Sequence, residues 1–289
     1  MITLINNSYK IAVVGGDNRQ ELVYKHLKDN GYSVTLQGYK NDVDFSAISS
    51  SDIIILPTVV TKDGVTLNAP NCASEINLDT LLNMLNKCNY IICGNITKEL
   101  EAQINLKNIK TFKYTDCPIF KTLNAVPTAE GAIAIAIEKT DRTVCGSRCL
   151  IIGNGCIGKN LAKSLKGLGA KVTVSARKEL DFASLWSEGI NYINTLELNN
   201  YNLNEFDIIF NTVPKRIIMR DNLMKINKDK LIIDLASRPF GFEHNDKDLG
   251  CTLLLAPSLP AKYAPKSSAE ATIKTIENYI LEVVNNGQN

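Results

Sequence analysis

A glycine-rich segment in the second half of the chain carries the clearest chemical signal. The run Gly153-Asn154-Gly155-Cys156-Ile157-Gly158 follows apolar residues 150–152 and opens a stretch with apolar residues at helical spacing. In such a turn the first glycine permits the tight bend, the second admits a pyrophosphate to the backbone, and the third allows close helix packing. The helix N-terminus adds free amides and partial positive charge. The segment predicts a dinucleotide-binding site; the alternative is a turn whose glycines serve structure alone.

The end of the next predicted strand, 172–174, bears on which dinucleotide is bound. In NAD-binding proteins an acidic side chain roughly 20 residues beyond the glycines binds the ribose 2′-hydroxyl. Here the chain continues Ser175-Ala176-Arg177-Lys178, with a hydroxyl and two cations. Because an arginine fork matches phosphate geometry, Ser175, Arg177 and Lys178 favour NADP, and NAD is the less favoured cofactor. Under the alternative interpretation, Arg177 and Lys178 are ordinary solvated loop charges.

Two further polar turns follow predicted buried strands, Asn211-Thr212-Val213-Pro214 and Ala236-Ser237-Arg238-Pro239. Ligands of open parallel sheets bind beyond the carboxyl ends of the strands. We therefore expect Asn211, Thr212 and Val213 to line the cofactor site. Arg238 is a candidate for substrate binding, because an arginine directly after a buried strand needs an anionic partner or solvent.

The first half of the chain has its own glycine turn, Gly15-Gly16-Asp17-Asn18-Arg19-Gln20, after apolar residues 11–14. The turn lacks the full fingerprint, and Asp17 would place negative charge beside a pyrophosphate, so a second dinucleotide site is not expected. A helix start that carries Arg19 could instead hold a small carboxylate. The alternative is a plain turn.

Groups suited to proton transfer are sparse. His26 and His244 fall in a predicted helix and a polar loop, where a surface position is more usual than a catalytic one. The sequence contains no G-x-S-x-G turn, which argues against hydrolysis. The remaining candidates for a catalytic acid or base are Glu130, Asp234 and Lys266, and Asp234 has the alternative of a local structural pairing.

Short apolar runs alternate with amphipathic stretches in two successive series, which is typical of βαβ units. This predicts an α/β fold of two doubly wound, Rossmann-like parallel-sheet domains with an interdomain cleft. A small-residue helix would cross between the domains, and a final helix would pack back on the first. We expect an N-terminal substrate-binding domain at 1–127 plus 268–289 and a dinucleotide-binding domain at 128–267. The predicted strands are 11–14, 34–36, 53–56, 90–93, 111–114, 149–152, 172–175, 208–212, 231–235 and 252–255. The helix that crosses between the domains is predicted at 129–138, and the final helix at 269–284.

Composition and charge limit the classes of function. The 289 residues include 32 Lys and Arg against 30 Asp and Glu, without a long basic run, which argues against a nucleic-acid or membrane partner. The N-terminus lacks the apolar stretch of a signal peptide, and no apolar run reaches the roughly 18 residues that span a bilayer, so we expect a cytoplasmic protein. Eight cysteines without a C-x-x-C pair predict reduced, mostly buried thiols and no metal site.

A set of six segments spreads over nearly the whole chain: 15–20, Asn124–Gly131, Gly146–Arg148, Asp234–Pro239, Leu255–Pro260 and Ala264–Lys266. In this order the segments resemble the family of dipicolinate synthase A subunits. The glycine fingerprint alone would be generic, whereas the set together is specific.

The resemblance implies NADP-linked oxidation of a cyclic dihydrodipicolinate to dipicolinate, pyridine-2,6-dicarboxylate, in the mother cell of a sporulating bacterium. It also implies that the partner is a flavoprotein-like B subunit, while association of the chain with itself stays open. We expect Arg19 and Arg238 to bind the two substrate carboxylates, with Asn124, Thr128 and Glu130 nearby. These residue roles are inferred from the sequence of this chain.

Two other functions fit the same pattern. A non-catalytic scaffold would bind substrate and dinucleotide for a flavoprotein partner, and a shikimate-dehydrogenase-like NADP oxidoreductase would act on another small acid. The second domain is also distantly similar to 2-hydroxyacid dehydrogenases. In this chain Ser258 follows Pro257, where those enzymes have an acid–base histidine, which puts 2-hydroxyacid oxidation in doubt.

Overall fold

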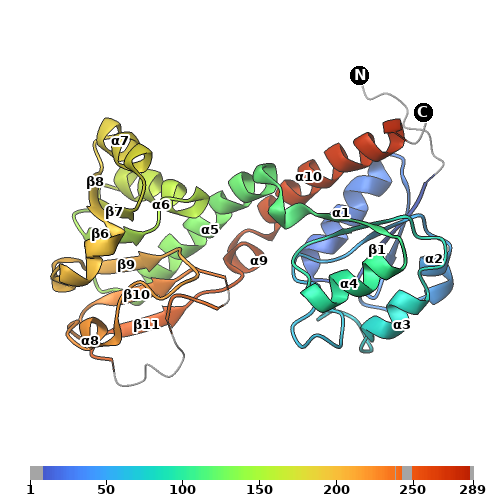
Figure 1. Cartoon of the computed structure of the whole chain (residues 1–289), viewed down its shortest axis with the longest axis horizontal. Coiled ribbons are helices and arrows are strands. Elements are labelled where there is room, and N and C mark those ends of the chain that lie inside the picture. The colour runs from blue at the N-terminus through green and yellow to red at the C-terminus, as the bar shows by residue number, and fades with distance from the viewer. Residues whose placement is uncertain (1–8, 238, 243–248, 287–289) are drawn as a thin grey trace. The chain divides into compact units, whose positions relative to one another are not determined.

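The chain folds into two compact units, each built on its own parallel sheet (Figure 1). The computed structural model describes residues 9–237, 239–242 and 249–286. The first unit comprises Met1–Leu123 and Pro265–Asn289, and the second comprises Asn124–Ala264. The predicted boundaries, 127/128 and 267/268, lie four and three residues further along the chain than this division.

The first unit has a five-stranded parallel sheet in the order β2-β1-β3-β4-β5, one of the two common orders of doubly wound folds. Its strands are buried apolar runs, as expected where helices cover both faces of a parallel sheet. The strands are β1 (Lys10–Val14), β2 (Ser33–Gln37), β3 (Ile53–Ile55), β4 (Tyr90–Cys93) and β5 (Lys110–Lys113).

The last helix of the chain returns to this first unit, as the sequence predicts. Helix α10 (Pro265–Asn286) packs beside α1 (Asn18–Asp29) in Figure 1, and Ile276 and Ile280 join Val23 in one buried cluster. The remaining helices of the unit are α2 (Phe45–Ser49), α3 (Leu78–Asn83), α4 (Lys98–Leu106) and the 3-10 turn Tyr114–Asp116.

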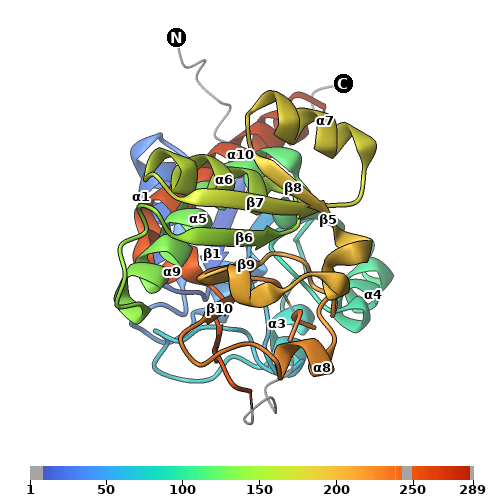
Figure 2. The same ribbon diagram turned by 90° about the vertical axis from the view of Figure 1, so that its left-hand side faces the viewer.

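The second unit has a six-stranded parallel sheet in the order β11-β10-β9-β6-β7-β8, which is the Rossmann order 3-2-1-4-5-6 read from its other edge. Figure 2 shows β7, β6 and β9 as neighbours. The edge strand β8 was not predicted, because only Ile193 of its four residues is buried. The strands are β6 (Arg148–Ile152), β7 (Lys171–Ala176), β8 (Asn191–Asn194), β9 (Ile208–Asn211), β10 (Leu231–Asp234) and β11 (Thr252–Leu255).

Helix α5 (Pro118–Lys139) is much longer than the predicted helix at 129–138. It continues through Pro127, although a proline inside a helix lacks the amide for one backbone hydrogen bond. Buried Ala125, Ala129 and Ala132 line the helix around and beyond the proline, so packing outweighs that loss. The helices that lie wholly in the second unit are α6 (Cys156–Gly167), α7 (Glu179–Ser187), α8 (Arg220–Leu223), α9 (Leu259–Tyr263) and the 3-10 turns Thr195–Asn200 and Leu203–Glu205.

No disulfide joins the cysteines that the structure describes, but fewer of these cysteines are buried than the sequence suggested. Cys88, Cys93 and Cys149 are buried, whereas Cys145 and Cys156 are exposed and the other three are half-buried. Burial raises the pKa of each of the three buried thiols to about 12. Within the described parts of the chain, no cluster of three or more His, Cys, Asp or Glu side chains could hold a metal ion. The described helices also include none with the length and apolar character needed to span a bilayer.

Replacing Ile276 by alanine tests the packing of α10 on the first unit. Its side chain is 0% exposed, so the change removes apolar contacts and leaves a cavity, and we expect a loss of about 2–5 kcal/mol in the free energy of unfolding measured in urea. Lys274→Ala, at an exposed position of the same helix, is the matched control and should change stability by less than about 0.5 kcal/mol. Equal, small effects of both changes would contradict the packing.

Candidate dinucleotide-binding site

The predicted glycine turn lies where β6 ends and α6 begins, and its three glycines differ in what surrounds them. Gly153 has a φ of 101°, and a Cβ atom there would lie 2.6 Å from the Thr212 hydroxyl. A Cβ atom on Gly158 would collide with the Gly153 carbonyl, so only glycine lets α6 approach the strand this closely. At Gly155 nothing lies within 4 Å of such an atom. The backbone there is open to a ligand.

The geometry of this turn fits the pyrophosphate of a dinucleotide. Gly155 is the N-cap of α6 and has no side chain to cap the helix, so amides of the first helical turn lack an internal partner. Those amides and the helix dipole attract an anion. Buried Leu161 and Leu165 anchor α6 on the sheet and thereby fix the turn.

The end of β9 supports the turn from the neighbouring strand, at the point where the strand order of the sheet reverses. The Thr212 hydroxyl donates to the Ile152 carbonyl at 2.8 Å. Val213 packs against the position of Gly153. Asn211 is buried, and its side chain binds the amide and carbonyl of Val213 at 3.2 and 3.0 Å. The structure thus brings the three predicted residues to the turn, with Asn211 beneath the surface.

Asp234, a predicted catalytic candidate, lies at the centre of a buried hydrogen-bond network. Its Oδ1 accepts from Asn211 Nδ2 at 2.8 Å and from the Ala236 amide at 3.0 Å. Its Oδ2 accepts from the amides of Gly241 and Phe242 at 2.8 and 3.2 Å. Four donors fix this fully buried carboxylate, so the geometry matches the structural alternative, in which Asp234 holds the segment after β10 in place.

Ser175, near the end of strand β7, and the two cations in the loop that follows the strand have different surroundings. Arg177 and Lys178 are exposed, and Lys178 is the N-cap of α7. Ser175 is 0% exposed, and its hydroxyl accepts a hydrogen bond from Thr195 at 3.2 Å. In this structure Ser175 therefore bonds inside the domain, and Arg177 and Lys178 are the groups of this loop that a phosphate could reach.

An acidic side chain next to the glycine turn was missed in the sequence. Asp181 Oδ1 accepts from Asn154 Nδ2 at 3.0 Å, and Asn154 is the residue between the first two glycines. The spacing rule looks for an acid at the end of the strand, whereas Asp181 lies in the first turn of α7. A search that extended into the following helix would have found it.

The other predicted catalytic and substrate residues are distributed over both units. Glu130 is exposed on α5, and buried Thr128 donates its hydroxyl to the Asn124 carbonyl at 2.7 Å. Lys266 is exposed on α10 of the first unit. The predictions for Arg238 and His244 fall outside the described residues.

Arg19, the predicted carboxylate-binding residue of the first unit, is paired with Asp17. Its Nε lies 2.9 Å from Asp17 Oδ1 and its Nη2 lies 2.8 Å from Oδ2, while Nη1 lies 3.5 Å from the Ser268 hydroxyl. Burial alone would raise the pKa of Asp17, but the hydrogen bond and charge of Arg19 outweigh it and hold that pKa below its usual value. The pair is therefore charged at neutral pH.

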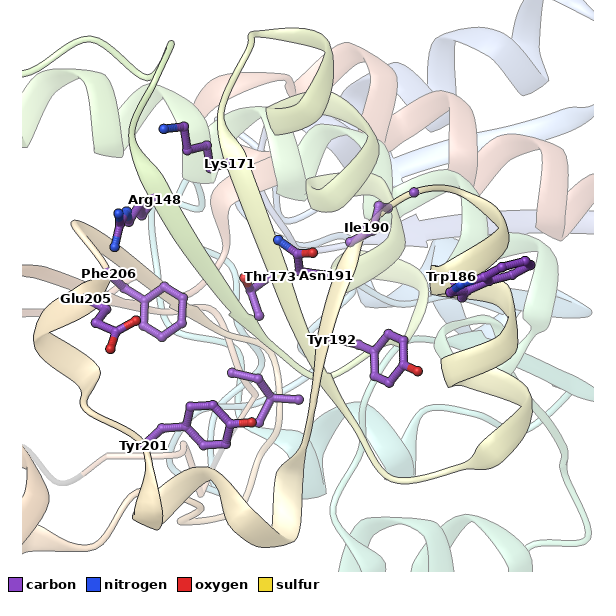
Figure 3. Close-up of a pocket in the computed structure, with 12 residues that line it drawn as sticks. Arg148, Lys171, Thr173, Trp186, Ile190, Asn191, Tyr192, Tyr201, Glu205 and Phe206 are labelled. Carbon is purple, nitrogen blue, oxygen red and sulfur yellow. The ribbon is translucent and has the colours of Figure 1, made fainter.

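A cavity of about 810 Å³ opens in the second unit, beside the amino ends of the strands β6, β7 and β8 (Figure 3). Arg148, Lys171 and Asn191, the first residues of β6, β7 and β8, line it together with Tyr201 and Phe206. Dinucleotides bind at the carboxyl ends of such strands, and this cavity is at their amino ends. It is therefore distinct from the glycine turn.

Sheet order and glycine turn together define a dehydrogenase-type α/β fold. The sequence profile described as "Shikimate / quinate 5-dehydrogenase" matches residues 134–240. In fold, the chain is similar to a transhydrogenase from Sinorhizobium meliloti, with a TM-score of 0.72 at 14% identity over 95% of this chain and 94% of that one. The fold is therefore of the oxidoreductase type.

Similarity over the whole chain at 25% identity or more points to a smaller group of proteins. The profile for the N-terminal domain of the dipicolinate synthase A subunit matches residues 10–115. The A subunit of Bacillus subtilis dipicolinate synthase is 31% identical over 95% of this chain and 96% of that protein, and its crystal structure gives a TM-score of 0.85 at 30% identity, covering 96% and 98%. The corresponding protein of Bacillus halodurans gives 0.83 at 25% identity, covering 95% and 97%. The chain belongs to the family of dipicolinate synthase A subunits, as the sequence motifs indicated.

Cys156 offers a direct probe of the glycine turn, because it is exposed and is the first residue of α6. A pyrophosphate over this turn should shield its thiol, so saturating NADP should slow alkylation of Cys156 by at least about fivefold. Peptide mass spectrometry after timed iodoacetamide treatment measures the rate. Cys145, which is also exposed, should react at an unchanged rate. Equal rates at Cys156 with and without dinucleotide would count against the site.

Changing Asp234 to asparagine tests the buried network. The amide nitrogen of asparagine would face a pair of donors in place of a carboxylate oxygen, which leaves them without an acceptor. We expect the free energy of unfolding to fall by about 2–4 kcal/mol, measured by urea denaturation. Asp221→Asn, at an exposed position in α8, is the control and should be nearly neutral. A neutral Asp234→Asn variant would show that the network does not stabilise the fold.

Proposed function

We propose that the chain oxidises a dihydrodipicolinate to dipicolinate, with NADP as the hydride acceptor. The observation that carries the proposal is the open backbone at Gly155, at a helix start, in a member of the dipicolinate synthase A-subunit family. The relatives named for that activity match over nearly their whole length. This supports the same substrate class, a six-membered nitrogen-containing ring with two carboxylates.

In the proposed reaction, two electrons and two protons leave the dihydropyridine ring. A bound nicotinamide would take the hydride, and the remaining proton would go to a base or to water, which restores aromaticity in the ring. Aromatisation favours this step, so the protein needs chiefly to hold the ring in place. Glu130 and Lys266 remain the candidates for a catalytic acid or base, since the Asp234 carboxylate is committed to four donors.

Arg177 and Lys178 support the choice of NADP, because both are exposed at the end of β7 beside the turn. We propose that they bind the 2′-phosphate and that NAD binds less well. The proposed cofactor contacts are residues 153–158 together with Thr212 and Val213.

Arg19 is the proposed carboxylate-binding residue of the first unit. The Nε and Nη2 of Arg19 bond to Asp17, whereas its Nη1 bonds to the Ser268 hydroxyl at 3.5 Å. We propose that a substrate carboxylate binds at this Nη1, beside Ser268. Arg238, Asn124 and Thr128 complete the proposed substrate contacts. The proposed partners are the dicarboxylate substrate and a flavoprotein-type B subunit, in the cytoplasm of the sporulating mother cell.

A scaffold function is the second candidate. The fully hydrogen-bonded Asp234 favours it, because one of three candidate acid–base groups is already used for structure. In that case a flavoprotein partner would carry out the redox step on a substrate held by this chain.

One experiment separates the two functions. The purified chain, alone and with its B subunit, is mixed with freshly generated dihydrodipicolinate and NADP or NAD, and the absorbance of dipicolinate and of reduced nicotinamide are followed together. Dehydrogenase function predicts equal amounts of dipicolinate and NADPH, with NADP preferred. Dipicolinate without reduced nicotinamide would instead assign the redox step to the partner.

A further inference from the structure

The residue between the first two glycines carries an acceptor atom that the protein leaves unused. Asn154 donates through Nδ2 to Asp181, and its Oδ1 is buried without a hydrogen-bond partner among the described residues. A buried acceptor without a donor costs about 1–3 kcal/mol, so such atoms in native proteins usually have a functional explanation. A donor from a ligand would satisfy this one.

Asp181 places a second acceptor beside the first. Its Oδ1 holds Asn154, and no described residue bonds to its other carboxylate oxygen. Asp181 lies three residues after Lys178, in the first turn of α7, and the amide of Asp181 bonds to the Lys178 carbonyl at 2.9 Å. The two acceptors therefore adjoin the loop that carries Arg177 and Lys178.

The chemistry of this pair matches the hydroxyls of an adenosine ribose. In dinucleotide-binding folds the ribose lies between the glycine turn and the end of the following strand, and an acid there accepts from the 2′-hydroxyl. A ribose diol offers two donors for two acceptors. A 2′-phosphate offers no such donor and is repelled by a carboxylate.

We propose that Asp181, held by Asn154, binds the adenosine ribose hydroxyls. In this way Asp181 opposes the preference for NADP that Arg177 and Lys178 create. The inference rests on the proposed dinucleotide site and refines it. The cations attract the 2′-phosphate of NADP, and the acceptor pair favours the free diol of NAD. The chain therefore binds both cofactors, and the difference between their affinities is a balance of opposing groups.

Binding of NADPH and NADH to the full-length chain tests this, with nicotinamide fluorescence as the readout. Asp181→Asn removes the charge and keeps the side-chain shape, so the affinity for NADPH should rise and that for NADH should fall. The ratio should move toward NADPH by about tenfold. Arg177→Ala should move the ratio the other way. Glu179→Gln, an exposed acid in the same turn of α7, is the matched control and should leave the ratio within about twofold.

The outcomes distinguish failure of the role proposed for Asp181 from failure of the proposed dinucleotide site. If the unmodified chain binds neither nucleotide, both the proposed site and this role of Asp181 are wrong. If it binds them but Asp181→Asn leaves the ratio unchanged, or lowers both affinities equally, only the role of Asp181 is wrong. Should that variant fail to fold, Asn154→Ala decides: loss of NADH affinity with NADPH affinity retained supports the inference, and parallel losses overturn it.

Discussion

The second unit is organised around the close approach of α6 to the end of β6. Gly158 makes the approach possible, because any side chain there would meet the Gly153 carbonyl. The approach aims the first turn of α6 at the point between β6 and β9 where the strand order reverses. Gly155 then leaves that turn uncovered. Backbone geometry thus gives a surface that suits a phosphate, without a charged side chain in the turn itself.

Polar and charged side chains have two different uses in this chain. Asp234 and Asn211 are buried at the ends of neighbouring strands and satisfy each other and nearby amides, which fixes the segment after β10. Asp17 and Arg19 form a partly exposed pair in the first unit, which keeps a cation in place at the start of α1. A preformed cation of this kind loses little conformational freedom when an anion arrives.

Sequence patterns predicted the architecture well because its strands are continuous apolar runs. All ten predicted strands overlap strands of the structure, and the glycine turn lies at its predicted junction. The misses have physical causes. The edge strand β8 has one buried side chain, and α5 passes through a proline that usually marks a helix end. Asp181 reaches Asn154 from a helix, and Ser175 is buried by tertiary packing, neither of which spacing along the chain reveals.

The open space at Gly155 is where we expect the pyrophosphate of a dinucleotide to bind. Gly155→Val tests this most directly, since a side chain there meets no protein atom within 4 Å of its Cβ and the φ of −81° suits any residue. Calorimetric titration with NADPH, alongside thermal unfolding, measures both effects. We predict an unfolding temperature within a few degrees of the unmodified chain and an affinity at least about tenfold weaker. Unchanged affinity in a folded variant would contradict a pyrophosphate site at this turn.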